Sequence, residues 1–460
     1  MLNDHLRSMI YDKYIKPTEN RRDTYAGIEI ELPIINLGGK ATDHTVSRAA
    51  MNSAVSHFGF QPLKYDDDGN LHEAQDPVTG DLFSFDCSYN NFEMSFARSQ
   101  NLNDVDARFR RYIEYLNNDL ILNNHLISGF GITPYYRLCR KDYIRCGRYG
   151  MLGGYLGKCC EWKKEGGCHA YPQFGTFASA SQIQVDVNTD ELLDTLRTFS
   201  LLEPVKSLLF ANSMMPQDEP DYLLIRDNLW EYSTHGINPR NVGGYEAIPE
   251  SIEELIEYIA YTSLFCTERD GRYLFFEPIP LVEYFTRDVI AGEYYENGKY
   301  YSFPFKPEET DLAYLRTYKF LDLTARGTIE YRSLCTQPLG QSFAGAAFQL
   351  GLLAKRDALR ELWARETVLY HHGLTANELR RQFNKGHIPD VLDREALRSL
   401  LIEITRLSEE GLKERGFGEE KYLLPVYERA ERISSPAKDM KDALAIGKPL
   451  SEIILEHAKL

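Results

Sequence analysis

The feature that most constrains this chain is a recurring pair of polar residues, two positions apart, inside otherwise apolar β-like runs. Successive side chains of a strand point to opposite faces, so both members of such a pair project together while their apolar neighbours enter the core. We therefore expect several strands that share one strongly polar face. The pairs are Glu29 with Glu31, Gln184 with Asp186, and Glu330 with Arg332.

Carboxylates dominate this expected polar face. Glu93 lies between Phe92 and Met94, and Asp86 precedes it by seven residues. A half-buried antiparallel sheet with one wet face explains each pair alone. Gathered on one concave face, however, these carboxylates would repel one another unless cations lay between them. Mg²⁺ binds through a few carboxylates plus substrate phosphates, and a nearby arginine neutralises a transferred phosphate. The set indicates a metal–nucleotide site on an antiparallel sheet.

Charge and motifs exclude several other classes of function. Fifty-two Lys and Arg against 68 Asp and Glu leave a net charge of −16 among 460 residues. This sign disfavours nucleic acid or an anionic membrane as the main partner. Gly157-Lys158 lacks the first glycine of a phosphate-binding loop, and neither G-x-S-x-G nor H-E-x-x-H occurs. Any nucleotide must be held in another way.

The N-terminal residues and the cysteines predict a reducing compartment. The first 23 residues lack the apolar core of a signal peptide, and the apolar run 339–354 is too short and polar to span a bilayer. We expect a cytoplasmic protein. Its eight cysteines should mostly be reduced thiols, and the cluster at 146–168 contains no C-x-x-C pair for a structural zinc. A thiol switch at Cys159-Cys160 is the less favoured alternative to idle cysteines.

The order of predicted elements indicates an α+β protein. β-like runs at 27–35, 183–187, 273–279 and 328–334 alternate with helical patterns at 103–122 and 189–209. After Phe343 the β-like runs cease. Helices are predicted at 343–363, 375–384, 394–415 and 419–433. We expect a catalytic domain over 1–354 and a helical C-terminal segment over 355–460 that packs on it.

Five short segments give the chain a resemblance to the glutamate–cysteine ligase family, in its plant and bacterial branch of carboxylate–amine ligases. They occur in the family's order and cover roughly residues 25 to 350. The resemblance implies a fold similar to glutamine synthetase, with an open, antiparallel barrel-like sheet, surrounding helices and an active site on the concave face. The segments are Gly27–Glu31, Asn91–Ala97, Ser181–Asp186, Leu208–Ser213 and Gly327–Arg332.

The resemblance also implies roles for individual residues. Arg332 matches the arginine that faces the γ-phosphate of ATP, and it forms the catalytic pair with Glu330. Arg226 matches the arginine that holds the donor amino acid, for which the fork of a guanidinium suits a carboxylate. Tyr149 and Tyr155 match the acceptor pocket. The residues that match ligands of two or three Mg²⁺ ions are Glu29, Glu31, Asp86, Glu93, Gln184 and Glu330.

The resemblance implies an ATP- and Mg²⁺-dependent ligase that joins the γ-carboxylate of glutamate to the amine of cysteine through an acyl phosphate, the first step of glutathione synthesis. The chain departs from the family after Arg332, where Ser-Leu-Cys-Thr-Gln-Pro follows, and in the loop 145–175. The acceptor therefore stays open, and another amine or another donor acid is the main alternative. More distant alternatives are phosphorylation of a guanidino or amide nitrogen and a non-catalytic metabolite-binding regulator. The partners are small molecules, and the oligomeric state stays open.

Overall fold

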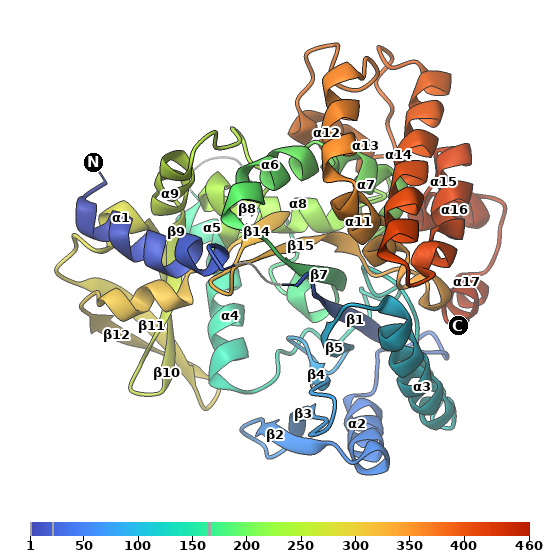
Figure 1. The fold of residues 1–460 in the computed structure, drawn as a ribbon. Coiled ribbons are helices and arrows are strands. Elements are labelled where there is room, and N and C mark those ends of the chain that lie inside the picture. The colour runs from blue at the N-terminus through green and yellow to red at the C-terminus, as the bar shows by residue number, and fades with distance from the viewer. Residues whose placement is uncertain (1, 21–22, 164–166) are drawn as a thin grey trace.

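The computed structural model describes residues 2–20, 23–163 and 167–460, and its centre is a nine-stranded sheet (Figure 1). The strands follow the order β14-β15-β7-β1-β5-β4-β3-β2, with β6 paired to β1, and all neighbours are antiparallel. The path is open from β14 to β2, which confirms the expected α+β class with an open antiparallel sheet. The bounds are β1 Ala26–Asn36, β2 Gln61–Tyr65, β3 Leu71–Gln75, β4 Leu82–Phe85, β5 Asn91–Ser99, β6 His125–Ile127, β7 Ala180–Asp186, β14 Leu321–Leu323 and β15 Thr328–Cys335.

The four strands that carry the polar residues lie next to one another, in the order β15, β7, β1 and β5. Glu31 of β1 is directly opposite Glu93 of β5, and Glu330 of β15 is opposite Gln184 of β7. Directly opposed residues in antiparallel strands share a face. The registers therefore gather the polar side chains on one face of the sheet.

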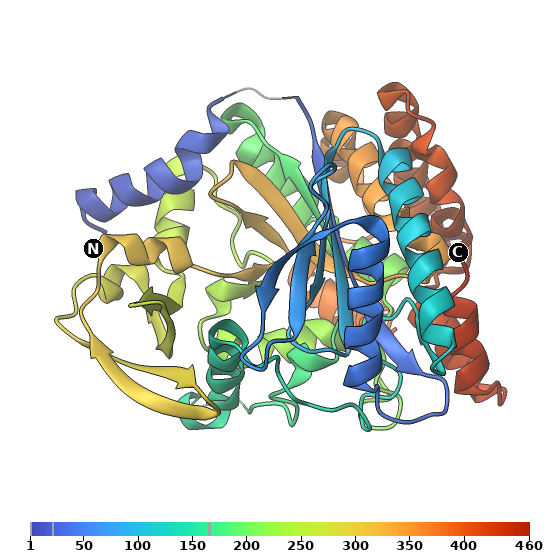
Figure 2. The same ribbon diagram turned by 90° about the horizontal axis from the view of Figure 1, so that it is seen from below.

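The other face is apolar and is covered by helices. Ile28 and Ile30 of β1 belong to the same buried cluster as Phe109 and Tyr112 of α3 (Leu102–Ile121). Figure 2 shows α3 and α2 (His44–Phe58) running along the strands on this side. Helix α2 ends at Gly59, whose φ of 74° is the left-handed conformation typical of a helix C-terminus.

A second sheet lies at the opposite end of the molecule from the C-terminal helices (Figure 1). It has the antiparallel order β12-β11-β10-β9, and a short parallel pair, β8 (Val242–Gly243) with β13 (Tyr318–Lys319), lies outside it. Helix α4 (Gly147–Gly157) packs on it through glycines, because a Cβ at Gly150 would lie 2.2 Å from the Tyr295 ring. The strands are β9 Ser263–Arg269, β10 Arg272–Pro280, β11 Ile290–Glu296 and β12 Lys299–Phe305.

Three of the predicted helices are each divided in two. The segment 189–209 forms α6 (Thr189–Ser200) and α7 (Glu203–Phe210), because Pro204 begins a new helix. The segment 343–363 forms α11 (Ala344–Ala354) and α12 (Arg356–Arg365). The segment 419–433 forms a 3₁₀ turn at Glu419–Leu423 followed by α15 (Leu424–Arg432). By contrast, α14 (Arg394–Arg415) has the predicted bounds.

The C-terminal helices share a core with the rest of the chain. Leu397 and Ile404 of α14 belong to the same buried cluster as Ile28 and Phe348. The division at 354 and 355 stays a prediction, although the packing agrees with a C-terminal segment docked on the sheet. In the described part of the chain, none of the helices has the length and apolar character needed to cross a membrane. The remaining helices are α1 Asp4–Ile10, α5 Cys159–Trp162, α8 Ile225–Glu231, α9 Ile252–Ala260, α10 Leu281–Tyr284, α13 Ala376–Phe383, α15 Leu424–Arg432, α16 Pro436–Ala445 and α17 Leu450–His457.

Candidate active site

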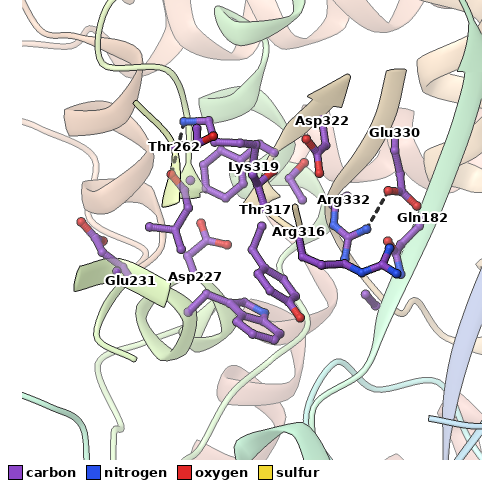
Figure 3. A pocket seen from close by; sticks show the side chains of 18 of the residues that line it. Gln182, Asp227, Glu231, Thr262, Arg316, Thr317, Lys319, Asp322, Glu330 and Arg332 are labelled. Carbon is purple, nitrogen blue, oxygen red and sulfur yellow. Dashed lines mark hydrogen bonds and ion pairs between the residues drawn. The ribbon is translucent and has the colours of Figure 1, made fainter. Parts of the chain in front are cut away.

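A cavity of about 820 Å³ lies against the polar face of the main sheet. Side chains from the main sheet, from α4, α8 and α13, from β13 and from the N-terminal segment line it. Figure 3 shows part of this lining, with Glu330 and Arg332 on one side and Asp227 and Glu231 on the other. Of the predicted site residues, those that line the cavity are Glu29, Glu31, Asp86, Glu93, Tyr149, Arg226, Glu330 and Arg332.

The carboxylates of the cavity are partly buried and close enough to repel one another. Burial, followed by the charges of Asp86 and Glu93, raises the pKa of Glu31 well above its usual range. Burial and the neighbouring Glu29 raise the pKa of Glu93 to about 8. Burial and Glu330 raise the pKa of Glu29. The cluster therefore favours any cation, a proton included, that reduces its negative charge.

Hydrogen bonds hold three of these carboxylates in place. Glu31 accepts from the Ala180 backbone N–H at 2.7 Å and from Gln182 Nε2 at 3.3 Å. Glu93 accepts from Ser95 Oγ at 2.8 Å, and Glu330 accepts from Arg332 Nη1 at 2.7 Å. The Glu330–Arg332 pair joins two side chains of one strand, as the i, i+2 spacing predicts.

The structure places two of the predicted residues away from the cavity lining. Gln184 is on the polar face opposite Glu330, but the glutamine that lines the cavity is Gln182, two positions earlier and opposite Glu29. Tyr155 is fully buried, and its ring stacks on Phe265 with centroids 4.2 Å apart. Helix α4 turns Tyr155 toward the small sheet and leaves Tyr149 at the cavity, because these residues lie on different sides of the helix.

Asp322 lines the cavity although the motifs did not point to it, and Arg148, next to Tyr149 in the segment matched to the acceptor side, lines it as well. Asp322 is directly opposite Glu330 in the β14–β15 register, and burial raises its pKa to about 6. The alternating run Leu321-Asp322-Leu323 was the sequence signal for this residue. Tyr149, followed by Asp86 and Glu93, raises the pKa of the Arg148 guanidinium. It is a positive charge beside Tyr149, next to the carboxylate cluster.

The predicted donor-binding arginine is built into the wall of the cavity. Arg226 Nη1 donates to the Leu334 carbonyl at 3.0 Å, and Nη2 donates to the Arg332 carbonyl at 3.1 Å. Arg226 is 7% exposed. These two bonds connect Arg226 to β15. Because a guanidinium carries five N–H donors, other N–H groups of Arg226 are left for a ligand.

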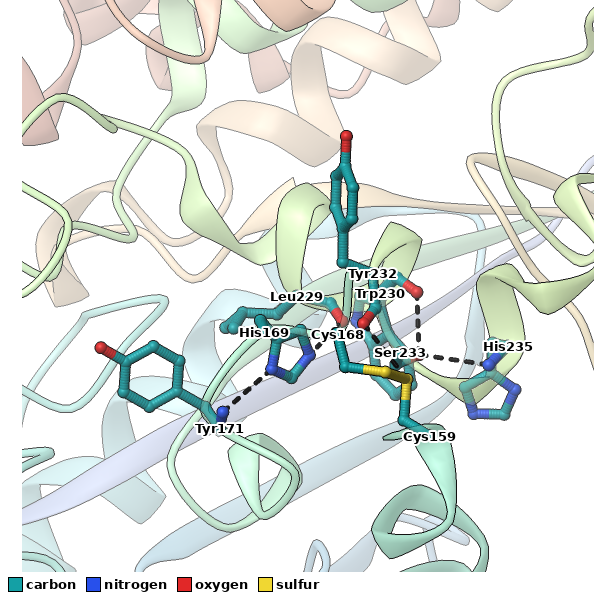
Figure 4. Close-up of a disulfide and its surroundings, with 9 residues drawn as sticks. All are labelled: Cys159, Cys168, His169, Tyr171, Leu229, Trp230, Tyr232, Ser233 and His235. Carbon is teal, nitrogen blue, oxygen red and sulfur yellow. Dashed lines mark hydrogen bonds between the residues drawn. A yellow bond between two sulfur atoms is a disulfide. The ribbon is translucent and has the colours of Figure 1, made fainter. Parts of the chain in front are cut away.

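A disulfide between Cys159 and Cys168 lies beside this wall (Figure 4). We expected these cysteines to be idle thiols, but their sulfurs are bonded and their Cα atoms lie 6.2 Å apart. Cys159 Sγ is 3.5 Å from the carbonyl oxygen of Tyr232, a residue that lines the cavity. The disulfide thus supports the segment 230–232. The other six cysteines are free, as expected.

The oxygen atoms that line the cavity decide whether a divalent cation fits there. In the described part of the chain, no three His, Cys, Asp or Glu side chains are gathered closely enough to hold an ion by themselves. Pairs of carboxylates share the cavity, and Gln182 Oε1 is a buried acceptor with no hydrogen-bond partner. Mg²⁺ usually takes one or two carboxylates and completes its shell with water and substrate phosphates. The residues therefore fit a substrate-completed Mg²⁺ site.

Comparison with known proteins supports the same family. The chain is 22% identical over 321 residues to the chloroplastic glutamate–cysteine ligase B of Oryza sativa subsp. japonica, covering 65% of this chain and 56% of that protein. It is 23% identical over 332 residues to the chloroplastic enzyme of Solanum lycopersicum, covering 68% and 56%. The chain thus spans a little over half the length of these relatives. No family model matches it.

Solved structures show weaker likeness. A glutamate–cysteine ligase from Francisella tularensis in complex with AMP has a TM-score of 0.44 at 11% identity, covering 96% of this chain and 88% of that one. At this score the likeness carries no argument about the site. The sequence comparison, by contrast, confirms the resemblance that the five segments indicated. The chain is similar to the chloroplastic glutamate–cysteine ligases at 22–23% identity.

Proposed function

We propose that the protein is an ATP-dependent ligase that joins the γ-carboxylate of glutamate to the amine of cysteine. The observation that supports this most directly is the cavity in which five carboxylates of one sheet face, Glu29, Glu31, Glu93, Asp322 and Glu330, lie beside Arg332. This arrangement suits a triphosphate with Mg²⁺ better than a neutral metabolite. The sequence similarity to glutamate–cysteine ligases supports the same activity.

The proposed reaction has two steps. A γ-carboxylate oxygen of glutamate attacks the γ-phosphorus of ATP, the bond to the β-phosphate oxygen breaks, and ADP leaves. The neutral amine then attacks the acyl carbon, inorganic phosphate leaves with the bonding electrons, and the amine loses a proton to form the amide. Both steps depend on positioning and charge neutralisation rather than on a covalent enzyme intermediate.

The chain's own residues would divide these tasks. Arg332, held by Glu330, would neutralise charge at the transferred phosphoryl group. Arg226 would orient the donor carboxylate with the N–H groups that do not brace β15. Bound Mg²⁺ would neutralise phosphate charge, held by Glu29, Glu31, Asp86, Glu93 and Glu330, with Gln182 in the place we expected for Gln184.

The acceptor side of the cavity leaves a second amine as the main alternative. Tyr149 donates to the Phe85 carbonyl at 3.2 Å, and Met151 and Trp230 add apolar surface. This mixed wall suits a small amino acid such as cysteine and also other small amines. Tyr155, the other residue matched to the acceptor pocket, would act only through the packing of α4.

Phosphate release from ATP with Mg²⁺ tests the proposal. We expect release that requires glutamate and rises most with cysteine among a panel of amines. A greater rise with another amine would keep the chemistry and change the acceptor. Absence of release with every pair of acid and amine would contradict the ligase activity and favour a binding protein.

A further inference from the structure

Three of the cationic side chains that line the cavity are Arg332, Arg316 and Lys13. The guanidinium carbon of Arg332 is 5.3 Å from the centre of the Tyr318 ring. Arg316 lies two residues before Tyr318, and its positive charge acts on Lys13 of the N-terminal segment. Figure 3 shows Arg316 on the same side of the cavity as Arg332 and Glu330, away from Asp227 and Glu231.

The other two cations lack carboxylate partners. Whereas Arg332 pairs with Glu330, neither Arg316 nor Lys13 forms an ion pair with any described residue. Lys13 Nζ donates to the Leu312 carbonyl at 2.5 Å. Burial, followed by the positive charge of Arg316, lowers the pKa of Lys13 to about 8. An anion between the two cations would relieve this repulsion.

The local backbone turns Lys13 toward the cavity. Residues Tyr11–Ile15 continue α1 as a π-helical turn, a conformation found frequently at functional sites. Lys13 and Tyr14 of this turn both line the cavity, and Tyr14 is 6% exposed. The turn precedes every segment that resembles the ligase family, so the resemblance assigns it no role.

We propose that Lys13 and Arg316 form a subsite for the polyphosphate chain of the nucleotide, together with Arg332. The inference rests on the proposed function for the identity of the nucleotide. A single substrate carboxylate is satisfied by one guanidinium fork. Several separate charges in one cavity instead match several phosphates in a chain, for which lysine acts as a point charge.

Calorimetric titration of the full-length protein with inorganic tripolyphosphate and with Mg-ADP tests this subsite. We expect Lys13→Met and Arg316→Gln each to weaken both ligands by about tenfold, as loss of a charge-assisted hydrogen bond does. Lys13→Arg should restore most of the affinity. Lys16→Met is the matched control, because Lys16 is in the same segment but is exposed and paired with Asp12. The melting temperature of each variant, measured in EDTA, separates weakened binding from loss of fold.

Two results would overturn the subsite. One is unchanged affinity of both ligands in the folded Lys13→Met and Arg316→Gln variants. The other is a raised glutamate KM with an unchanged ATP KM, which would assign the cations to the donor carboxylate. Failure of the proposed function is distinguishable from both. The wild-type protein could bind tripolyphosphate through Lys13 and yet turn over no ATP with any acid and amine. That result would contradict the ligase activity and still support the subsite.

Discussion

Arg380 of α13 donates two hydrogen bonds to the carboxylate of Asp227 in α8, at 2.6 and 3.2 Å, across 153 residues of sequence. Its Nη1 also donates to Glu203 Oε2 at 3.0 Å, and the side chain is almost fully buried. Because Asp227 directly follows Arg226, this contact connects the C-terminal helices to the wall of the candidate site.

Arg380→Met should therefore destabilise the protein by about 3 kcal/mol or more, because breaking a buried ion pair leaves its partners charged and unpaired. Urea unfolding measures the change. Arg381→Met is the matched control, since its ion pair with Glu231 is largely exposed and should contribute less than about 1 kcal/mol. Equal effects of the two substitutions would contradict the assigned role of Arg380.

Glu29→Gln and Glu330→Gln should each lower ATP turnover by at least about 100-fold, the effect of removing one electrostatic contact to a transition state. We expect the fold to persist, because glutamine keeps the shape and an acceptor oxygen at each position, and at Glu29 the change also removes repulsion with Glu330. Phosphate release and circular dichroism provide the two measurements. Glu277→Gln, on the exposed side of β10, is the control. Wild-type-like turnover in both site variants would remove the metal assignment.

The raised pKa of Glu93 predicts a pH dependence of stability without metal. The folded protein holds this proton up to about pH 8, whereas an ordinary glutamate releases it near 4.5. The folded state thus binds more protons between these values, and its stability should fall as pH rises through this window. Melting temperatures in EDTA measure the fall. Glu93→Gln should reduce it, and an identical pH profile in that variant would contradict the assignment.

Mg²⁺ should reverse this trend, because it binds the charged carboxylates and displaces their protons. The increase in melting temperature on adding Mg²⁺ should be larger at pH 8 than at pH 6. An increase that is equal at the two values would show that Mg²⁺ binds away from the buried cluster.

Arg226→Ala should raise the KM for glutamate far more than the KM for ATP. It should also weaken β15, because the carbonyls of Leu334 and Arg332 lose their donor. Arg226→Lys retains a cation but loses the planar guanidinium. Relative to Arg226→Ala, it should therefore restore the stability of the fold more than the affinity for glutamate. Steady-state kinetics with each substrate varied in turn test this. Equal increases of both KM values would exclude a specific donor role.

Cys159→Ser with Cys168→Ser should lower the free energy of unfolding by about 2–3 kcal/mol, as expected for a short loop closed by a disulfide. Urea unfolding with and without a dithiol reductant measures it. Cys160→Ser is the control, because this neighbouring thiol is free and exposed. The dithiol reductant should lower the urea midpoint of the wild-type protein and leave that of the double variant unchanged. A midpoint in the double variant equal to that of the oxidised wild-type protein would show that the disulfide does not support the fold.

The sequence by itself determined the local pattern. Alternation in 27–35 and 328–334 identified strands β1 and β15 and the residues of their polar face, because the period of a strand follows from backbone geometry alone. Helical periodicity located α14 at its observed bounds for the same reason. Short motifs in the right order also indicated the family.

Only the tertiary structure decided which of these elements meet. It placed β15, β7, β1 and β5 side by side, chose Gln182 over Gln184 for the cavity and turned Tyr155 into the interior. It also brought Lys13 to the cavity from the N-terminal segment. Such contacts depend on packing between distant segments, for which a local pattern carries no signal, whereas the alternation within each strand is repeated at every second residue.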